Sequence, residues 1–337
     1  MTTPDRLDYN QLLLDHPWIT QPGLSCVLSP DSDGMLCGLL MTNALGWNVA
    51  GFYDGKVLIL RDGLKPKDCV FLDIEINRPD VRSVGHHLMV WSNRILPRVP
   101  NFNLASCIQP NNLRGIDGRD SFQRKYPFGT IHLLVSILYE SGVLERLAEE
   151  ATTVLLFTDG VWNNLFGYTE NCLDWFSYLR FNDPGQPLHH IFNHTTSIHD
   201  VMADMNRFLR VRDQCNASGM FVNGTYATGG RNLRTGDKLR ISNPDGSPIN
   251  LEQDGNVHRI HQKEKDRVEQ FLNALTDRTG WVYNPNQWCW KGLTLRKMEK
   301  GAIKPSNERY IDLFRRNPLS LAMTSSDLIE FTVEHQP

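Results

Sequence analysis

Short apolar runs alternate with longer amphipathic stretches over the first 195 residues. Continuous apolar runs of strand length, typical of strands buried on both faces, cover residues 24–28, 49–53, 69–76 and 153–157, with further candidates at 56–60 and 88–91. Helical spacing of apolar residues marks 35–45, 130–147 and 171–179. Strands that alternate with helices predict an α/β fold, with a mostly parallel sheet flanked by helices.

The pattern changes near residue 195. Residues 198–211 and 263–275 predict helices, and residues 216–255 are rich in Gly, Asn and Asp with short β-like pieces. We therefore divide the chain into a first domain, residues 1–195, and a smaller α+β C-terminal domain, residues 196–337. We expect the second part to bind substrate or to serve as an interaction domain.

Composition narrows the class of protein. The 337 residues carry a net charge of -3, so no overall basic field draws the chain to nucleic acid. The seven cysteines are scattered and never form a CxxC pair, which favours reduced thiols and argues against a structural zinc site. The N-terminus lacks a signal-peptide pattern, and no apolar run is long enough to span a bilayer. These features predict a cytoplasmic protein with no membrane span.

Candidate chemistry follows the predicted strands. Asp31 and Asp33 lie in a Asp-Ser-Asp-Gly turn between a strand and a helix, and Asp73 lies inside the apolar run 69–76. Gly85-His86-His87 comes next, and Asp159 follows the run 153–157. Open α/β sheets bind ligands at the carboxyl ends of their strands. Each position also has an ordinary explanation: a capping aspartate, an exposed strand end, an incidental histidine pair or a turn.

Taken in this order, the four positions resemble the motifs of the Asp-His-His (DHH) phosphoesterases, which include RecJ-like nucleases, oligonucleotide and cyclic-dinucleotide phosphodiesterases and family II pyrophosphatases. The segment SPDSDGMLCGLL followed by NVAGFY matches the first motif of that family, in which an Asp-x-Asp-Gly turn leads into a helix and then a strand. Asp73 matches the second motif, residues 85–87 the third and Asp159 the fourth. The resemblance covers about residues 24–180.

The resemblance implies a site with two divalent cations, Mn²⁺ or Mg²⁺, and two-metal hydrolysis of a phosphoester. The metal ligands that it implies are Asp31, Asp33, Asp73, His86 and Asp159. It implies catalytic roles for Asp33, Asp73 and His87, with His87 also binding the substrate phosphate. Arginines around the loop at 94–125 are candidates for binding phosphate oxygens, namely Arg82, Arg94, Arg98 and Arg119, of which Arg82 and Arg119 are taken as the substrate-binding pair.

The expected activity is that of a metal-dependent phosphodiesterase or nuclease. Its substrate would be a single-stranded nucleic acid, an oligonucleotide or a nucleotide, cyclic or linear. The chain departs from the family pattern because Gly85 replaces the first Asp of Asp-His-His and no histidine precedes the first motif. Only residues 229–232 (GGRN) echo the glycine-rich substrate motif of the family's second domain.

Two alternatives remain open. In a haloacid-dehalogenase-like phosphatase, Asp31 would be the nucleophile and Asp33 the general acid. The chain would otherwise be a catalytically degenerate DHH-like protein that binds or assembles without turnover. In that second case a homo-oligomer or a protein partner would use the C-terminal part, where Trp281, Trp288 and Trp290 are candidates for a contact surface.

Overall fold

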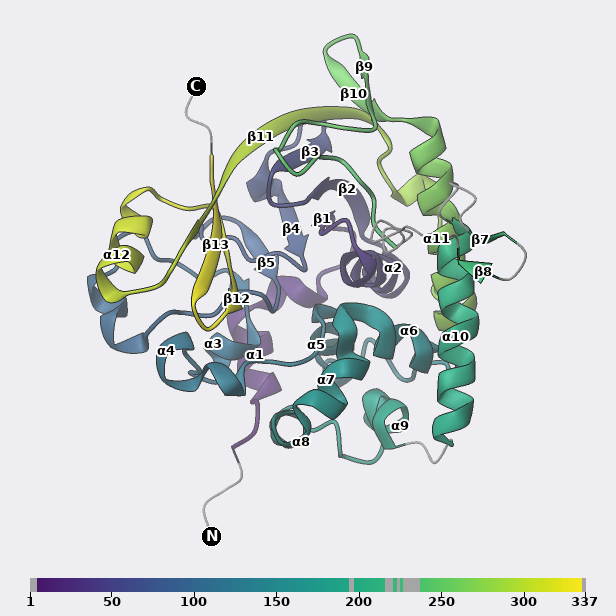
Figure 1. Ribbon diagram of the computed structural model, residues 1–337, viewed down its shortest axis with the longest axis horizontal. Helices are drawn as coiled ribbons and strands as arrows, with labels where there is room; N and C mark the ends of the chain where they lie inside the picture. The colour runs from purple at the N-terminus through teal and green to yellow at the C-terminus, as the bar shows by residue number, and fades with distance from the viewer. Residues whose placement is uncertain (1–4, 194–196, 216–220, 223–224, 227–236, 335–337) are drawn as a thin grey trace.

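A curled sheet flanked by helices organises the protein, for which we describe a computed structural model. The structure describes residues 5–193, 197–215, 221–222, 225–226 and 237–334. One end of the sheet carries the first six strands, whose order across the sheet is 3-2-1-4-5-6; Figure 1 labels β1 to β5 among them. These strands are β1 (Ser25–Leu28), β2 (Asn48–Tyr53), β3 (Val57–Arg61), β4 (Cys69–Leu72), β5 (Arg82–Val84) and β6 (Cys107–Ile108).

The strand order reverses between β1 and β4. From β1 the chain passes through a helix to β2 on one side, whereas β4 lies on the other side of β1 and leads outward to β5 and β6. Strand β1 is parallel to both β2 and β4, and β4, β5 and β6 are parallel to one another, while β3 is antiparallel to β2. In sheets of this kind the crevice at the carboxyl ends of the two strands beside the reversal is the usual ligand site.

The two faces of the sheet bury different residues, as the period of two in a strand requires. In β1, Cys26 and Leu28 belong to the large core, whereas Val27 belongs to a second, smaller core on the other face. The smaller core also contains Met298 and Leu319 from the C-terminal part of the chain. Because both faces are covered, the central strands β1, β2 and β4 are mostly apolar, which is why their sequences read as continuous apolar runs.

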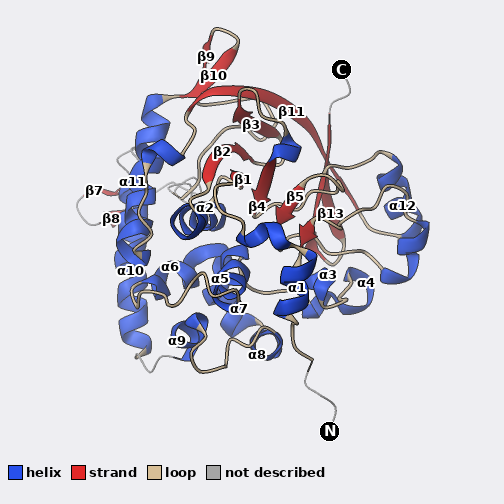
Figure 2. Ribbon diagram, turned by 180° about the vertical axis from the view of Figure 1, so that it is seen from behind, coloured by secondary structure: helices blue, strands red, loops and turns tan. Residues whose placement is uncertain are grey.

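Helices flank the sheet and pack on one another below it (Figures 1 and 2). α2 contacts β1, β2 and β4, and it also packs on α5. α10 lies alongside α11 at one side of the molecule. The helices are α1 (Tyr9–Asp15), α2 (Ser32–Leu45), α3 (Pro110–Leu113), α4 (Gly118–Ser121), α5 (Thr130–Glu140), α6 (Ala151–Phe157), α7 (Val161–Gly167), α8 (Thr169–Tyr178), α9 (Pro187–Asn193), α10 (Ile198–Cys215), α11 (Gln262–Thr279) and α12 (Asn307–Arg315).

The C-terminal part extends the same sheet. Strand β11 (Lys291–Ile303) pairs with β3 through residues 293–297 and then with β13 through residues 298–303, so the sheet curls along this one strand. The other strands after residue 195 are β7 (Phe221–Val222), β8 (Thr225–Tyr226), β9 (Leu251–Asp254), β10 (Val257–Ile260), β12 (Ser320–Ser325) and β13 (Leu328–Glu334). The predicted boundary near residue 195 therefore does not separate two sheets, apart from the small β7–β8 pair.

Three of the predicted strands differ in the structure. Residues 153–157 form most of helix α6 rather than a strand, because this apolar segment is buried among α7, α10 and α11. A short apolar run cannot by itself distinguish a buried strand from a buried helix. The strand predicted at 69–76 ends at Leu72, since Asp73 takes a positive φ of 63°. Residues 88–91 are irregular, and the neighbouring strand is β5 instead.

The tryptophans near the C-terminus belong to the core. Trp281, Trp288 and Trp290 are buried, and the Trp290 ring stacks on Phe52 with 5.5 Å between ring centroids. They therefore do not form the exposed contact surface that the sequence allowed. No helix in the described part of the chain is long and apolar enough to cross a membrane. The glycine-rich residues 229–232 lie outside the described residues.

Candidate metal centre

The turn between β1 and α2 carries the first two carboxylates. Asp31 is the N-cap of α2, and its Oδ1 accepts a hydrogen bond from the Gly34 backbone N–H at 3.3 Å. Asp33 lies in the first turn of the helix and is fully buried. A Cβ at Gly34 would lie 2.0 Å from the carbonyl oxygen of Ser29. The glycine is therefore required by the close approach of the Ser29 backbone.

Asp33 meets the N-terminus of a second helix. Its two carboxylate oxygens accept hydrogen bonds from the backbone N–H groups of Thr130 at 2.6 Å and Ile131 at 3.0 Å, which begin α5. The free N–H groups and the dipole at a helix N-terminus both stabilise negative charge. A Cβ at Gly129, the residue before α5, would lie 2.9 Å from Asp33 Oδ2. A glycine at this position therefore leaves space for the Asp33 carboxylate at the helix N-terminus.

Asp73 comes from the end of β4, where its positive φ turns the chain out of the sheet. Its Oδ1 accepts a hydrogen bond from the Thr130 hydroxyl at 2.8 Å and lies 3.3 Å from both His86 Nδ1 and His87 Nε2. Its Oδ2 is buried and has no hydrogen-bond partner. A buried carboxylate oxygen without a partner is costly, so this atom is a clear candidate to bind a cation.

His86 and Asp159 complete the cluster. His86 Nδ1 lies 2.9 Å from the Thr130 hydroxyl, and its Nε2 lies 3.5 Å from Asp159 Oδ2. Asp159 takes a positive φ of 50° in the turn between α6 and α7. Asp33, Asp73, His86 and Asp159 each offer a ligand atom, and these four atoms all lie within 4.8 Å of one another. A second group, Asp73, His86 and His87, meets the same limit.

Like charges crowd this cluster. Burial, together with the carboxylates of Asp73 and Asp159, raises the pKa of Asp31 to about 7 and raises the pKa of Asp33 well above its usual value. Burial also disfavours the charge of Asp73, but the neighbouring His87 and His86 hold its pKa well below the usual range. Burial opposes protonation of His87, yet the Asp73 carboxylate raises its pKa to about 10. The His87 ring is therefore the cationic group that faces these carboxylates, and a divalent cation bound among them would further offset their negative charge.

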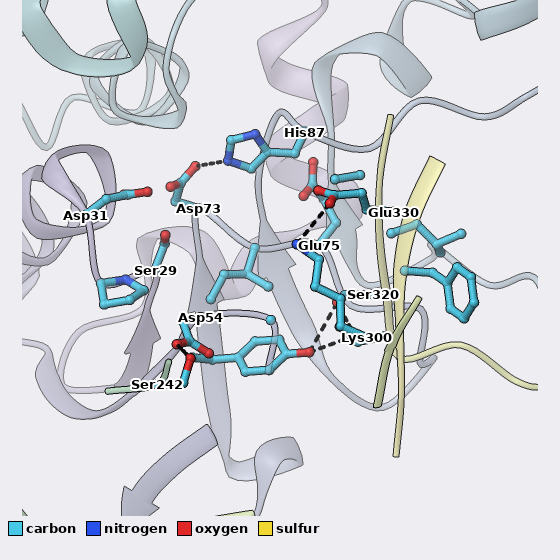
Figure 3. A pocket seen from close by; sticks show the side chains of 18 of the residues that line it. Ser29, Asp31, Asp54, Asp73, Glu75, His87, Ser242, Lys300, Ser320 and Glu330 are labelled. Atoms are coloured by element: carbon cyan, nitrogen blue, oxygen red, sulfur yellow. Dashed lines mark hydrogen bonds and ion pairs between the residues drawn. The ribbon is translucent and has the colours of Figure 1, made fainter. Parts of the chain in front are cut away.

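Two cavities flank these residues. The first, of about 490 Å³, extends from Asp31, Asp73 and His87 to the strands β11–β13, where Lys300, Ser320 and Glu330 lie (Figure 3). The second, of about 710 Å³, lies beside Asp159 and is bounded by α6, α7 and α10; the apolar residues that line it are Leu156, Phe157, Trp162, Met205 and Leu209. Asp31 and Lys238 line both cavities.

The predicted residues fall into two groups. The structure brings together four of them, namely Asp33, Asp73, His86 and Asp159. Asp31 and His87 lie at the edge of this cluster. Arg82 and Arg119 are not among the described residues that line either cavity, and Arg119 pairs instead with Asp120 at 3.9 Å. Arg94 also pairs with Asp120, at 3.3 Å, and Arg98 is exposed.

Sequence reasoning missed Thr130 and Lys238. Thr130 bonds three members of the cluster, and its position at the start of a predicted helix was the only signal of an N-terminal role. Lys238 Nζ lies 3.9 Å from Asp31 Oδ2, and the adjacent Leu239 N–H donates to the Pro30 carbonyl at 2.8 Å. No local pattern links residue 238 to residue 31, because the contact depends on the fold.

Comparison with known proteins found no matching family model, no matching curated protein and no matching solved structure.

Proposed function

We propose that this protein is a metal-dependent phosphoesterase whose cation is held by Asp33, Asp73, His86 and Asp159. The observation that carries the proposal is the convergence of these four ligand atoms within 4.8 Å at the reversal of strand order. Three carboxylates and one imidazole are ligands that suit Mn²⁺. The resemblance to DHH phosphoesterases supports the same ligand set from the sequence side.

The residues present fit a divalent cation in two respects. The buried Asp73 Oδ2 lacks a partner, and a cation would satisfy it. Burial and mutual repulsion also raise the pKa values of Asp31 and Asp33, which a positive charge among them would reverse. Asp31 lies outside the four-residue group, so these features support one complete site more strongly than the two ions of the sequence prediction.

When bound, a divalent cation supplies Lewis-acid polarisation of a phosphoryl group and neutralises its charge. The side chains of the protein would do the rest. His87 projects into the first cavity with 37% of its side chain exposed, so its ring is placed to donate a hydrogen bond to a phosphate oxygen. Lys238, with 53% of its side chain exposed beside Asp31, is placed to attract the same anion.

The two cavities favour a phosphodiester over a phosphomonoester. A phosphodiester carries an organic group on each side of phosphorus, and Asp31 and Lys238 line both cavities. Each volume lies in the range of about 300–1,000 Å³ that is usual for small-molecule sites. Trp162 and Phe157 line the second cavity, and aromatic side chains are the usual stacking partners of a nucleobase. We therefore propose a substrate in which the scissile phosphate joins two nucleoside-sized groups.

The test is hydrolysis of a substrate panel with added Mn²⁺. The panel contains bis-p-nitrophenyl phosphate, p-nitrophenyl phosphate and a dinucleotide, and it compares the native chain with Asp73→Asn and with the control Asp62→Asn, an exposed carboxylate outside the cluster. We expect Mn²⁺-dependent turnover that prefers the diesters, survives in the control and is lost in Asp73→Asn. Turnover that proceeds through a trappable acyl-phosphate at Asp31 would instead support the haloacid-dehalogenase-like alternative.

A further inference from the structure

Glu75 is a buried carboxylate that stands outside the four-residue metal cluster. Only 2% of its surface is exposed, and it follows β4 by three residues. A charged group buried to this extent needs partners that hold it. Those partners identify what Glu75 does, because they belong to one short segment of the chain, residues 85–88.

Both ends of that segment contact the Glu75 carboxyl group. At one end, Glu75 Oε1 accepts a hydrogen bond from the Leu88 backbone N–H at 2.7 Å. At the other end, a Cβ built on Gly85 would lie 2.6 Å from Glu75 Cδ and 2.7 Å from Oε2. The segment therefore wraps around this carboxyl group, and His86 and His87 lie between its two points of contact.

The other side of the segment is held as well. The side-chain amides of Gln109 and Asn111 donate hydrogen bonds to the Leu88 carbonyl oxygen. Glu75 thus holds Leu88 through its N–H. Gln109, the N-cap of α3, and Asn111 of α3 hold the same residue through its carbonyl oxygen. A segment bound at both faces can present two imidazole rings in one orientation.

The contact also explains why residue 85 is glycine. Gly85 does not have a positive φ, so its backbone conformation is open to any residue. The constraint is steric, because a side chain at position 85 would need the volume that the Glu75 carboxyl group fills. The Glu75 carboxyl group therefore occupies the space that a side chain at position 85 would fill.

We propose that Glu75 is a positioning residue, whose carboxylate holds residues 85–88 so that His86 and His87 face Asp73. The inference rests on the proposed function only in taking His86 as a cation ligand. Removal of groups that orient a metal ligand typically lowers metal affinity about 10–100-fold.

Relocating the carboxylate tests this role. The variants are Glu75→Ala, Glu75→Gln, Gly85→Asp and the double variant Glu75→Ala/Gly85→Asp in the full chain. Mn²⁺ affinity is measured by titration calorimetry, and the histidine nitrogen coupling to bound Mn²⁺ is measured by pulsed EPR. Thermal unfolding of each metal-free variant is followed in parallel to show that it folds.

We expect Glu75→Ala to bind Mn²⁺ about 10–100-fold more weakly and to lose the nitrogen coupling. Glu75→Gln, which keeps an acceptor for Leu88 N–H, loses less. Gly85→Asp alone is impaired because its side chain meets Glu75, whereas the double variant recovers most of the affinity and the coupling.

Native Mn²⁺ affinity and coupling in Glu75→Ala would overturn the positioning role, and so would a double variant no better than Glu75→Ala. A native chain that binds Mn²⁺ with histidine coupling but hydrolyses no phosphoester would instead contradict the proposed function alone. A native chain that binds no Mn²⁺ would overturn both.

Discussion

Replacing Asp31 by Asn should stabilise the metal-free protein at neutral pH. Asp31 caps α2 through Oδ1, and the asparagine oxygen can accept the same hydrogen bond from Gly34. The substitution therefore removes a negative charge from a crowded acidic cluster without removing the helix cap. Only 22% of the side chain is exposed, so solvent screens the repulsion weakly.

The magnitude follows from the pKa of Asp31. Burial and the Asp73 and Asp159 carboxylates raise that pKa from the usual 3.8 to about 7. The difference is about three pH units, and at roughly 1.4 kcal/mol per unit the ionised group destabilises the folded state by about 4 kcal/mol above pH 7. Between pH 3.8 and about pH 7, Asp31 binds more protons in the folded state than in the unfolded chain. The destabilisation therefore grows as the pH rises from about 4 to about 7. Near pH 4 the penalty falls below about 1 kcal/mol.

The assay is urea unfolding in the presence of EDTA at pH 7.5 and pH 4.5, with the exposed Asp62→Asn as the matched control. We expect Asp31→Asn to raise the unfolding free energy by about 4 kcal/mol at the higher pH and by much less at the lower one, with the control within about 0.5 kcal/mol at both. Equal stabilisation at both pH values, or none at either, would refute the electrostatic account of the cluster.

Four further outcomes follow from the same structure. Asp73→Asn should lower Mn²⁺ affinity by more than about tenfold, measured by calorimetry, since it weakens a ligand shared by both candidate groups. Mn²⁺ binding at pH 6 should release protons, because the cation displaces them from Asp31 and its acidic neighbours; heats measured in two buffers of different ionisation enthalpy would reveal this. Gly85→Ala should destabilise the fold by about 1–3 kcal/mol in urea unfolding, since its Cβ would meet Glu75. Trp288→Ala should cost about 3–5 kcal/mol by the same measurement, because the ring is buried in the core and not at a surface.

The mixed α/β fold and the four-residue group follow from features that the sequence displays locally. Each strand that leads to the site is buried on both faces, so its apolar run is visible. Asp33 and Asp159 follow such runs in the sequence, and Asp73 lies within one. Asp33 and Asp73 could be placed near one another because the carboxyl ends of neighbouring parallel strands meet at one edge. Asp159 reaches the cluster although its preceding segment is a helix, since a turn at a helix end delivered it to the same place.

What the sequence did not reveal depends on contacts between distant residues. Thr130 joins Asp33 across 97 positions of chain, and the basic residue beside Asp31 comes from position 238. The return of the C-terminal strands to the first sheet is likewise a long-range pairing, between β11 and β3. The apolar segment at 153–157 was misassigned because burial on all sides gives a helix the same composition as a buried strand.

The most direct test of the central claim is a crystal structure of the protein with Mn²⁺, with anomalous diffraction collected on both sides of the manganese absorption edge. The account predicts an anomalous peak bounded by Asp33, Asp73, His86 and Asp159, with Asp73 Oδ2 among the ligand atoms. Manganese bound elsewhere, or no peak at this cluster at saturating Mn²⁺, would contradict it.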